Sequence, residues 1–362
     1  MKKILLITIC ALLVVSAAGY SQSLDSTLQK MAGSAVQGYV GPIVSGFGAD
    51  LNGGWFHRAP SAKMFGFDLE FGFVAMGTVF SDANKSIPAG VGGDFSFDAT
   101  QSAKLAASIP NYNALPANYQ TTIKNQISST VLQVELTGPT IIGTKTDTVK
   151  VKFPSKALTF NMPDGTQQTY TIPDNVINTG VTGYLDGLTV VPLFAPQLSI
   201  GTIVGTQFTF RYLPNYNIKD LGEFKYFGFG VQHNPGIWFP NPLPIDICAS
   251  YFTQTLDVGT IFTTKASAFG INLSKRFGPG ALNITPYAGF MLETSEMTFD
   301  YTSTLTTPNG GTQQIHVNLP LKGDNKSRIT LGLSLKLLFL NVNADYNIAT
   351  YNSFTGGLMF II

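Results

Sequence analysis

Polar and apolar residues alternate along much of this chain, most clearly in its second half. A period of two indicates a β-strand whose two faces meet different surroundings. Segments that combine an apolar face with a polar face lie at 64–75, 198–212, 245–251, 282–293, 328–339 and 341–348. They exceed the five or six residues usual in globular strands, and they suit a tilted strand that crosses a bilayer in about 9–11 residues. The pattern predicts membrane-crossing strands, with 198–212 as a single strand.

The fold class that follows is all-β: a transmembrane antiparallel β-barrel with a short helical segment near its N-terminal side. The clear segments give about ten strands and the weaker ones raise the number to about 14, with an even number expected. The alternative is a soluble β-sandwich, in which a second sheet would bury one face of the same strands. The length of the strands favours the barrel.

The region ahead of the first strand has a helical period. Its apolar residues recur at spacings of three and four, which predicts one face of a helix: Leu24, Leu28, Met31, Ala35 and Tyr39. A glycine-rich stretch follows from Gly38 to Gly54 and is expected to be irregular. We expect residues 22–60 to form a hatch-like segment that folds into or under the lumen of a barrel formed by residues 61–362.

Residues 81–187 are the least regular part of the barrel range. Alternation is weak there, polar turns are frequent, and a helical piece is indicated near 119–126. If the first strand starts in the periplasm, this stretch begins as the first external loop, because outer-membrane barrels keep long loops outside. It is either a long loop or cap insertion, or it contributes further wall strands.

The first residues have the order of a secretory signal peptide. Lys2 and Lys3 precede an apolar run from Ile4 to Val15, and small residues follow from Ser16. We expect residues 1–21 to be removed during export, with cleavage between Ala18 and Gln22, and the protein to reach the outer membrane. The alternative is a short buried N-terminal helix.

Composition supports export to a membrane. Charged residues make up only 12%, while Phe (27), Tyr (14) and Gly (37) are abundant, and no apolar run after residue 21 is long enough for a spanning helix. Of 22 basic and 21 acidic residues, loss of Lys2 and Lys3 leaves a net charge near −1, so nothing favours nucleic-acid binding. Cys248 remains as one cysteine, which excludes an intramolecular disulfide.

The sequence carries no motif for cofactor, metal or catalytic chemistry. It has no phosphate-binding glycine loop followed by Lys and Ser or Thr, no His-Glu-x-x-His, and no paired-cysteine metal site. We therefore expect no cofactor, no metal site and no enzyme. The least favoured alternative is an outer-membrane lipid hydrolase, in which His233 and a serine would act together; His233 otherwise reads as a loop residue beside Asn234.

Strand phase and position supply the candidate site residues. The ionisable residues predicted to line the lumen are Asp68, Glu70, Arg211, Arg276, Arg328 and Lys336. Their mixed signs indicate an ion-paired interior rather than an ion-selective one. Aromatic pairs near predicted strand ends are expected to anchor the barrel at the membrane interface: Trp55, Phe56, Trp238 and Phe239.

Two of these stretches resemble a family of uncharacterised outer-membrane proteins that is defined only as a domain of unknown function. The matching residues are Gly54-Trp55-Phe56, Gly66-Phe67-Asp68 and the pattern Gly228-x-Gly230-x-x-His233. The resemblance covers most of 36–362, the irregular stretch 81–187 excepted, and implies an outer-membrane barrel. The order of helix, glycine-rich segment and barrel is also similar to that of outer-membrane long-chain fatty-acid transporters, although their Asn-Pro-Ala motif is missing; this likeness implies a layout and no substrate.

The leading functional expectation is passive uptake or diffusion of a small hydrophobic molecule through a barrel with an N-terminal plug. The alternative is a non-transporting barrel that displays residues 81–187 for adhesion or surface structure. Expected partners are outer-membrane lipids, the outer-membrane assembly machinery and a small hydrophobic solute, with no nucleic acid. Alternation continues to Ile362, with the aromatic Phe360 two places before it, a weakened form of the terminal mark that assists barrel assembly.

Overall fold

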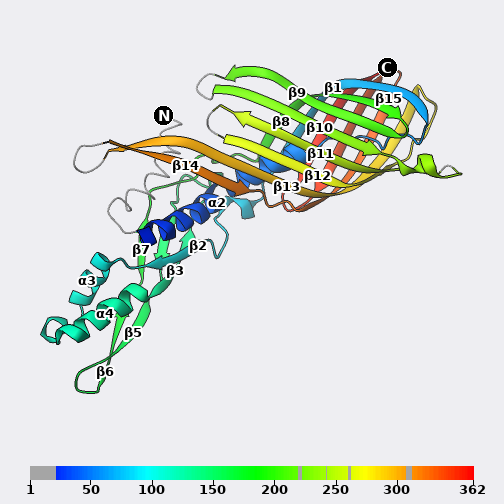
Figure 1. Ribbon diagram of the computed structural model, residues 1–362. Helices are drawn as coiled ribbons and strands as arrows, with labels where there is room; N and C mark the ends of the chain where they lie inside the picture. Colours follow the sequence, from blue (N-terminus) through cyan, green and yellow to red (C-terminus); the bar gives the residue numbers. More distant parts are fainter. Residues whose placement is uncertain (1–21, 219–221, 242, 260–261, 307–311) are drawn as a thin grey trace. The chain divides into compact units, whose positions relative to one another are not determined.

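A computed structural model describes residues 22–218, 222–241, 243–259, 262–306 and 312–362 (Figure 1). The predicted signal peptide lies outside the described residues. The chain divides into two compact units. Unit 1 contains the chain up to Val40 and residues 82–187 and 304–314, and unit 2 contains residues 41–81, 188–303 and 315–362. We describe each unit by itself.

Unit 2 is built on a closed antiparallel barrel of ten strands. In order around the wall, these are β1 (Phe65–Val79), β8 (Val190–Ile203), β9 (Thr206–Ile218), β10 (Gly222–His233), β11 (Asp246–Val258), β12 (Phe262–Ser274), β13 (Leu282–Thr306), β15 (Ser327–Leu337), β16 (Leu340–Ile348) and β17 (Ser353–Ile361). The ring closes because β12 pairs with β13 and β1 pairs with β17. A further strand, β14 (Thr312–Lys322), neighbours β13. The all-β barrel and its even strand number are confirmed.

The two faces of the wall have the polarity of an outer-membrane barrel. On β1, Phe71 and Phe73 are 45% and 48% exposed, whereas Glu70 is fully buried. On β15, Leu331 and Leu333 are exposed while Ser334 is buried. Exposed apolar side chains alternate with buried polar ones, the reverse of a soluble protein. This arrangement suits a wall that meets lipid outside and a polar lumen inside.

The prediction of one strand over 198–212 was wrong, because the chain turns back within it. Val204 and Gly205 form a two-residue turn with φ of 52° and 65°, and this turn joins β8 to β9. A register shift between Ile200 and Ile203 restores the pairing of residues of like parity, so that Gln197 faces Arg211. Odd-numbered residues therefore point inward on both strands, and the alternation in sequence continues through the turn.

The irregular glycine-rich stretch was also predicted wrongly: the helix α2 runs from Gln22 to Asn52 and includes Pro42. Glycine serves close packing here. A Cβ atom added at Gly46 would lie 3.1 Å from the Phe80 ring, and one at Gly48 would overlap the Ser295 side chain. Among the described residues, no helix has the length and apolarity needed to cross a membrane.

Residues 82–187 fold into structure of their own, and none of the strands described there pairs with the barrel wall. A four-stranded antiparallel sheet has the order β2 (Gly92–Ser96), β3 (Val131–Thr137), β4 (Lys150–Phe153) and β7 (Asn175–Asn178). The hairpin of β5 (Lys156–Asn161) and β6 (Gln167–Ile172) packs with helices α3 (Ala99–Ala107) and α4 (Ala117–Ser129) around a core that includes Ile127 and Phe160. The described residues also include three short 3₁₀ helices: η2 (Asp82–Lys85), η3 (Tyr112–Ala114) and, in the barrel unit, η4 (Pro235–Trp238).

The part of α2 that belongs to unit 1 is tied to this structure. The backbone N–H of Ile141 donates to the carbonyl of Tyr39 at 2.9 Å, and the Tyr39 hydroxyl donates to the carbonyl of Thr182 at 2.8 Å. Burial raises the pKa of Tyr39 from its ordinary value of 10 to about 12, so the phenol keeps its proton and continues to donate even in mildly alkaline solution.

Candidate functional site in the barrel lumen

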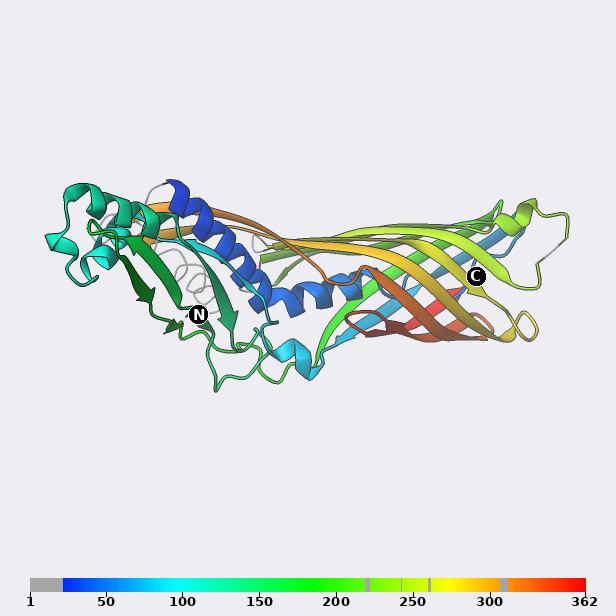
Figure 2. The same cartoon turned by 90° about the horizontal axis from the view of Figure 1, so that it is seen from below.

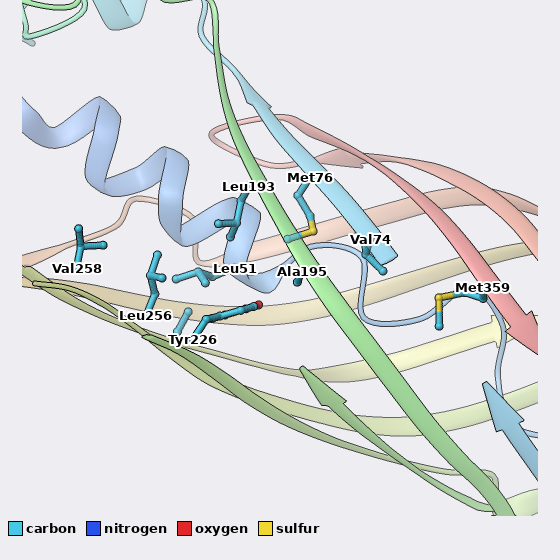
Figure 3. Close-up of a cluster of buried hydrophobic side chains, with 10 residues drawn as sticks. Leu51, Val74, Met76, Leu193, Ala195, Tyr226, Leu256, Val258 and Met359 are labelled. Atoms are coloured by element: carbon cyan, nitrogen blue, oxygen red, sulfur yellow. The ribbon is translucent and has the colours of Figure 1, made fainter. Parts of the chain in front are cut away.

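The lumen of the barrel is occupied by the chain's own residues 41–60, which we call the lumen segment. It comprises the last turns of α2 and the stretch that follows them. Leu51 at the end of the helix is fully buried in a cluster with residues of β1, β8, β10, β11, β12 and β17. Figure 3 shows these side chains gathered around Leu51, with Leu193 and Ala195 from β8 and Val74 and Met76 from β1. The lumen segment is thus packed against the inner wall on several sides.

Arg211 on β9 binds the end of α2. Its guanidinium donates to the carbonyls of Leu51 and Gly53, at 3.4 and 2.9 Å, and to the side-chain oxygen of Gln197 at 2.9 Å. The Leu51 carbonyl also accepts from Trp55 Nε1 at 3.0 Å and from the side-chain amide of Gln254. The last carbonyls of a helix lack partners within it and carry partial negative charge, so a buried cation there satisfies both needs.

The aromatic residues that follow the helix form a second contact with the wall. Trp55 stacks on Phe252 of β11 with ring centroids 5.0 Å apart, and the Arg211 guanidinium lies 4.1 Å from the Trp55 ring. Phe56 lies edge-on to Tyr287 of β13 at 5.8 Å. Trp55 and Phe56 are only 1% and 5% exposed. The prediction that they anchor the barrel at the membrane interface is therefore wrong, because the same aromatic rings fill the lumen.

Wall glycines make room for these rings. A Cβ atom added at Gly228 would lie 2.8 Å from the Trp55 ring, and one at Gly230 would lie 3.2 Å from it. Real Cβ atoms do not approach other atoms to 2.8 Å without displacing them. The Gly228-x-Gly230 pattern noted in the sequence thus leaves space for the stacked rings of Trp55 and Phe252, since a Cβ atom at Gly230 would lie 2.5 Å from the Phe252 ring.

An ion-paired cluster lies where the lumen segment leaves the barrel. Arg58 pairs with Glu70 of β1, with Nε to Oε1 at 3.1 Å, and with Asp68, with Nη2 to Oδ2 at 3.3 Å. His57 Nε2 lies 3.3 Å from the other oxygen of Glu70. Asp68 and Glu70, predicted to line the lumen, thus bind residues of the lumen segment rather than an open channel. Burial of charges demands such partners.

Two ends of the barrel can now be distinguished. The turn end carries the start of β1, the turn at Val204–Gly205 and the end of β17; the loop end is the opposite one, where β1 leads into residues 82–187. Ser45 hydrogen-bonds Asp324 at the loop end, at 3.0 Å. At the turn end, the Ala59 N–H donates to Ser274 Oγ at 3.0 Å, and Asn234 donates to the Pro60 carbonyl at 2.7 Å. The lumen segment therefore runs the length of the barrel.

The remaining candidate residues have different positions. Arg328 is buried and pairs with Glu293 at 3.1 Å, and Lys336 is partly buried. Arg276 is exposed in the connection after β12, so its assignment to the lumen is wrong: the strand ends at Ser274, two residues before it. Trp238 and Phe239 are 62% and 49% exposed beside η4, and their role at a membrane interface stays a prediction.

Several lumen residues escaped the sequence analysis. Gln197 and Gln254 are uncharged, and the search by strand phase considered ionisable groups. Asp345 lies on the polar face predicted for 341–348, yet only the structure shows that it accepts a hydrogen bond from Tyr287 at 2.9 Å. Asp50, which accepts from Thr78 at 2.7 Å, was placed in a stretch expected to be irregular. Their positions on the inward side of the alternation would have identified Gln197, Gln254 and Asp345, whereas no pattern in the sequence pointed to Asp50.

Neither a metal centre nor a catalytic pair emerges within the described ranges. No three His, Cys, Asp or Glu residues gather there in a way that could hold a metal ion. His233 Nδ1 lies 3.0 Å from Thr206 Oγ1, and Trp238 Nε1 donates to His233 Nε2 at 3.2 Å. In this arrangement both ring nitrogens of His233 have partners other than serine.

Comparisons with solved structures found outer-membrane proteins. One is OmpTdeltaL8, a loop-deletion mutant of OmpT, an outer membrane protein of Vibrio cholerae, at 11% identity and a TM-score of 0.24, covering 82% of this chain and 98% of that one. Another is the beta domain of the Bordetella autotransporter BrkA, at 10% identity and a TM-score of 0.19, covering 80% and 98%. At TM-scores this low we conclude nothing from the likeness. The barrel is established by the strand pairings of this chain.

The comparison with curated proteins found no match. The profile of DUF6588, described as a family of unknown function, matches residues 1–362. The resemblance inferred from the motifs around Trp55 and His233 is thereby confirmed, and the chain belongs to the DUF6588 family.

Proposed function

We propose that this protein is an outer-membrane anchor with a closed lumen, and that its barrel holds the folded residues 82–187 at the cell surface. The observation that carries the proposal is the lumen segment, which contacts the inner wall from Ser45 at the loop end to Pro60 at the turn end. A permanently open pore would leave the lumen to solvent. This protein instead fills it with its own helix end and aromatic rings.

The outer surface supports a position in a membrane. Outward residues of β13 are apolar from Leu282 to Leu292 and polar from Thr294 to Thr298. That apolar stretch has the length with which a tilted strand crosses a bilayer, about 9–11 residues. Lys225 on β10 and Lys265 on β12, the two strands that flank β11, face outward nearer the loop end than this apolar stretch. The apolar band therefore extends from the turn end, and the loop end projects beyond it.

Trp238 and Phe239 suit the edge of that band. They are exposed beside η4 at the turn end, where Phe339 is also 60% exposed. Trp and other aromatic residues concentrate at the level of lipid headgroups. A barrel of this polarity requires export and insertion. We therefore also propose that the predicted signal peptide directs export, that the assembly machinery inserts the barrel, and that outer-membrane lipids surround it.

Uptake of a small hydrophobic molecule is the second candidate. It is favoured by the apolar cluster inside the lumen, formed by Trp55, Phe56, Phe252 and Met291 together with Ala268 and Tyr287. Such a solute would have to displace Trp55 and Phe56, and a buried aromatic ring contributes some 150–250 Å² of contact surface. The closed anchor therefore fits the geometry better.

Conductance across planar lipid bilayers distinguishes the two functions. We expect the full chain to show no stable open channel and a variant lacking residues 41–60 to conduct ions. A disulfide can hold the lumen segment to strand β17. A Cβ atom at Gly53 would lie 3.2 Å from Thr355 Cγ2, so Gly53→Cys with Thr355→Cys brings two sulfur atoms within disulfide reach. Cys248→Ser supplies the background, and Gly53→Cys alone is the matched control.

The anchor predicts that oxidation of the double variant leaves the already closed barrel unchanged. A full chain that conducts, and stops conducting when the double variant is oxidised, would establish uptake through a mobile lumen segment instead. Protease treatment of intact cells tests the display half of the proposal. Cleavage within 82–187 that leaves the barrel in the membrane supports display, whereas cleavage only after cell rupture contradicts it.

A further inference from the structure

We infer that the chain ahead of Gly41 lies on the outer side of the membrane, together with residues 82–187, and that the lumen segment, residues 41–60, crosses the membrane inside the barrel. This inference rests on the proposed outer-membrane position and adds a sidedness to it. It assigns the N-terminal part of the chain, which follows the predicted signal peptide, to the same surface as the insertion.

The order of contacts along the lumen gives the direction. Ser45 binds Asp324, which lies between β14 and β15 at the loop end. Asp50 binds Thr78, near the loop-end terminus of β1. Trp55 follows at the level of Gly228 and Phe252. Each later residue of the segment contacts a wall position farther from the loop end.

The exit at the turn end is fixed as well. The N–H groups of Val204 and Gly205, in the turn between β8 and β9, donate to the carbonyls of Met64 and Lys63, each at 3.0 Å. Strand β1 starts at Phe65 directly afterwards and returns to the loop end. Residues 41–79 therefore make one pass down the lumen and one pass back along the wall.

The number of times that the chain crosses the barrel determines at which end each part of the chain lies. Ten wall strands form an even set, so a chain that entered the wall at the turn end leaves it there, as β17 does at Ile361. The pass inside the lumen adds one more crossing. Gly41 is consequently at the loop end and Ile361 at the turn end. An even-stranded barrel without this crossing would have both on one side.

The crossing is held at both ends and is no shallow insertion into the barrel. Ser45 accepts the N–H of Asp324 at 3.1 Å at one end, and Arg58 pairs with the buried Glu70 near the other. Outer-membrane barrels place short turns in the periplasm and longer connections outside. The loop end, with the insertion of residues 82–187, is then the outer one, and the chain ahead of Gly41 emerges there.

Labelling of single cysteines in intact cells tests the sidedness. In a Cys248→Ser background, we would place Ser23→Cys ahead of the lumen segment, Ala103→Cys on the exposed face of α3, and Gly280→Cys in the β12–β13 connection, where a Cβ atom would meet nothing within 4 Å. The probe is a membrane-impermeant maleimide, applied before and after permeabilisation of the outer membrane. We expect Ser23→Cys and Ala103→Cys to react in intact cells, and Gly280→Cys to react only after permeabilisation.

Two results would overturn the inference, and they differ. If Ser23→Cys reacts only after permeabilisation while Ala103→Cys reacts in intact cells, the crossing is wrong and the anchor stands. If the protein is absent from the outer-membrane fraction, the anchor and the crossing both fail. Disulfide formation between Gly53→Cys and Thr355→Cys in cells reports that the segment occupies the lumen, so a failure to label Ser23→Cys cannot be ascribed to a displaced segment.

Discussion

Single residues decide how the lumen segment fits its barrel. Gly228 leaves space for the Trp55 ring, and Arg211 joins that ring to two carbonyls at the end of α2. Both residues contact Trp55 and also a second part of the barrel. Substitution at either position should therefore affect the whole lumen contact, and the two substitutions act by different physical effects.

Gly228→Val should weaken the seat of Trp55, since its side chain would meet the ring. We expect a loss on the order of 2 kcal/mol in the free energy of unfolding, the usual cost of overpacking. In a Trp238→Phe background only Trp55 emits, so its fluorescence should shift to longer wavelength as it leaves the lumen. Gly356→Val is the control, because the nearest atom to a Cβ there is 4.0 Å away. Equal effects of both substitutions would contradict the contact.

Arg211→Met should cost about 3 kcal/mol of stability, because it removes charged hydrogen bonds to buried carbonyls. Denaturant unfolding in lipid vesicles would measure this loss. Lys265→Met, at an exposed outward position of β12, is the matched control and should change stability little. A neutral result for Arg211→Met would show that the guanidinium does not hold the helix end.

Elements show what the sequence could reveal and what it could not. The period of two located parts of β1, β13, β15 and β16 because each has one side toward lipid and the other toward the lumen. The same period concealed the turn at Val204, since the register shift before it keeps the inward parity. Position near a predicted strand end singled out the aromatic pair Trp55 and Phe56, yet an aromatic ring suits lipid headgroups and a packed lumen equally well. Only the pairing partners distinguish the two.

The β8–β9 turn offers a stability test. Val204 has φ of 52°, a conformation that costs an L-residue roughly 1–2 kcal/mol and is worst for a β-branched side chain. Val204→Asn supplies the residue favoured before Gly in this kind of turn. We expect the free energy of unfolding, measured with denaturant, to rise by about 1 kcal/mol. Ile203→Asn, one residue earlier in the extended strand, should give no gain; a gain there too would mean that polarity rather than backbone conformation is responsible.

At the scale of the whole molecule, the two units have separate cores. Ile127 of α4 is fully buried in unit 1, among residues such as Ile123 and Phe160. The lumen cluster around Leu51 belongs to unit 2. The sequence indicated a helix near 119–126 but not the sheet around β3, because its strands are short and their alternation is weak.

Ile127→Asp should unfold residues 82–187 and spare the barrel. A carboxylate in that core lacks partners, and burying a charge without them costs several kcal/mol. We expect faster proteolysis within 82–187 while the barrel keeps its different mobility in boiled and unboiled gel samples. Asn125→Asp, exposed on the same helix, is the control. Loss of the mobility difference in Ile127→Asp alone would show that the barrel depends on this core.

The pairing of β1 with β17 has a consequence for assembly. It joins Phe71 to Phe360, so the ring closes between the first and last strands of its wall. Contacts so distant along the chain form slowly. The residues that fill the lumen precede every wall strand and are present before closure, whereas a finished ring would have to be threaded afterwards. The growing sheet can therefore form around a segment of the same chain that is already present.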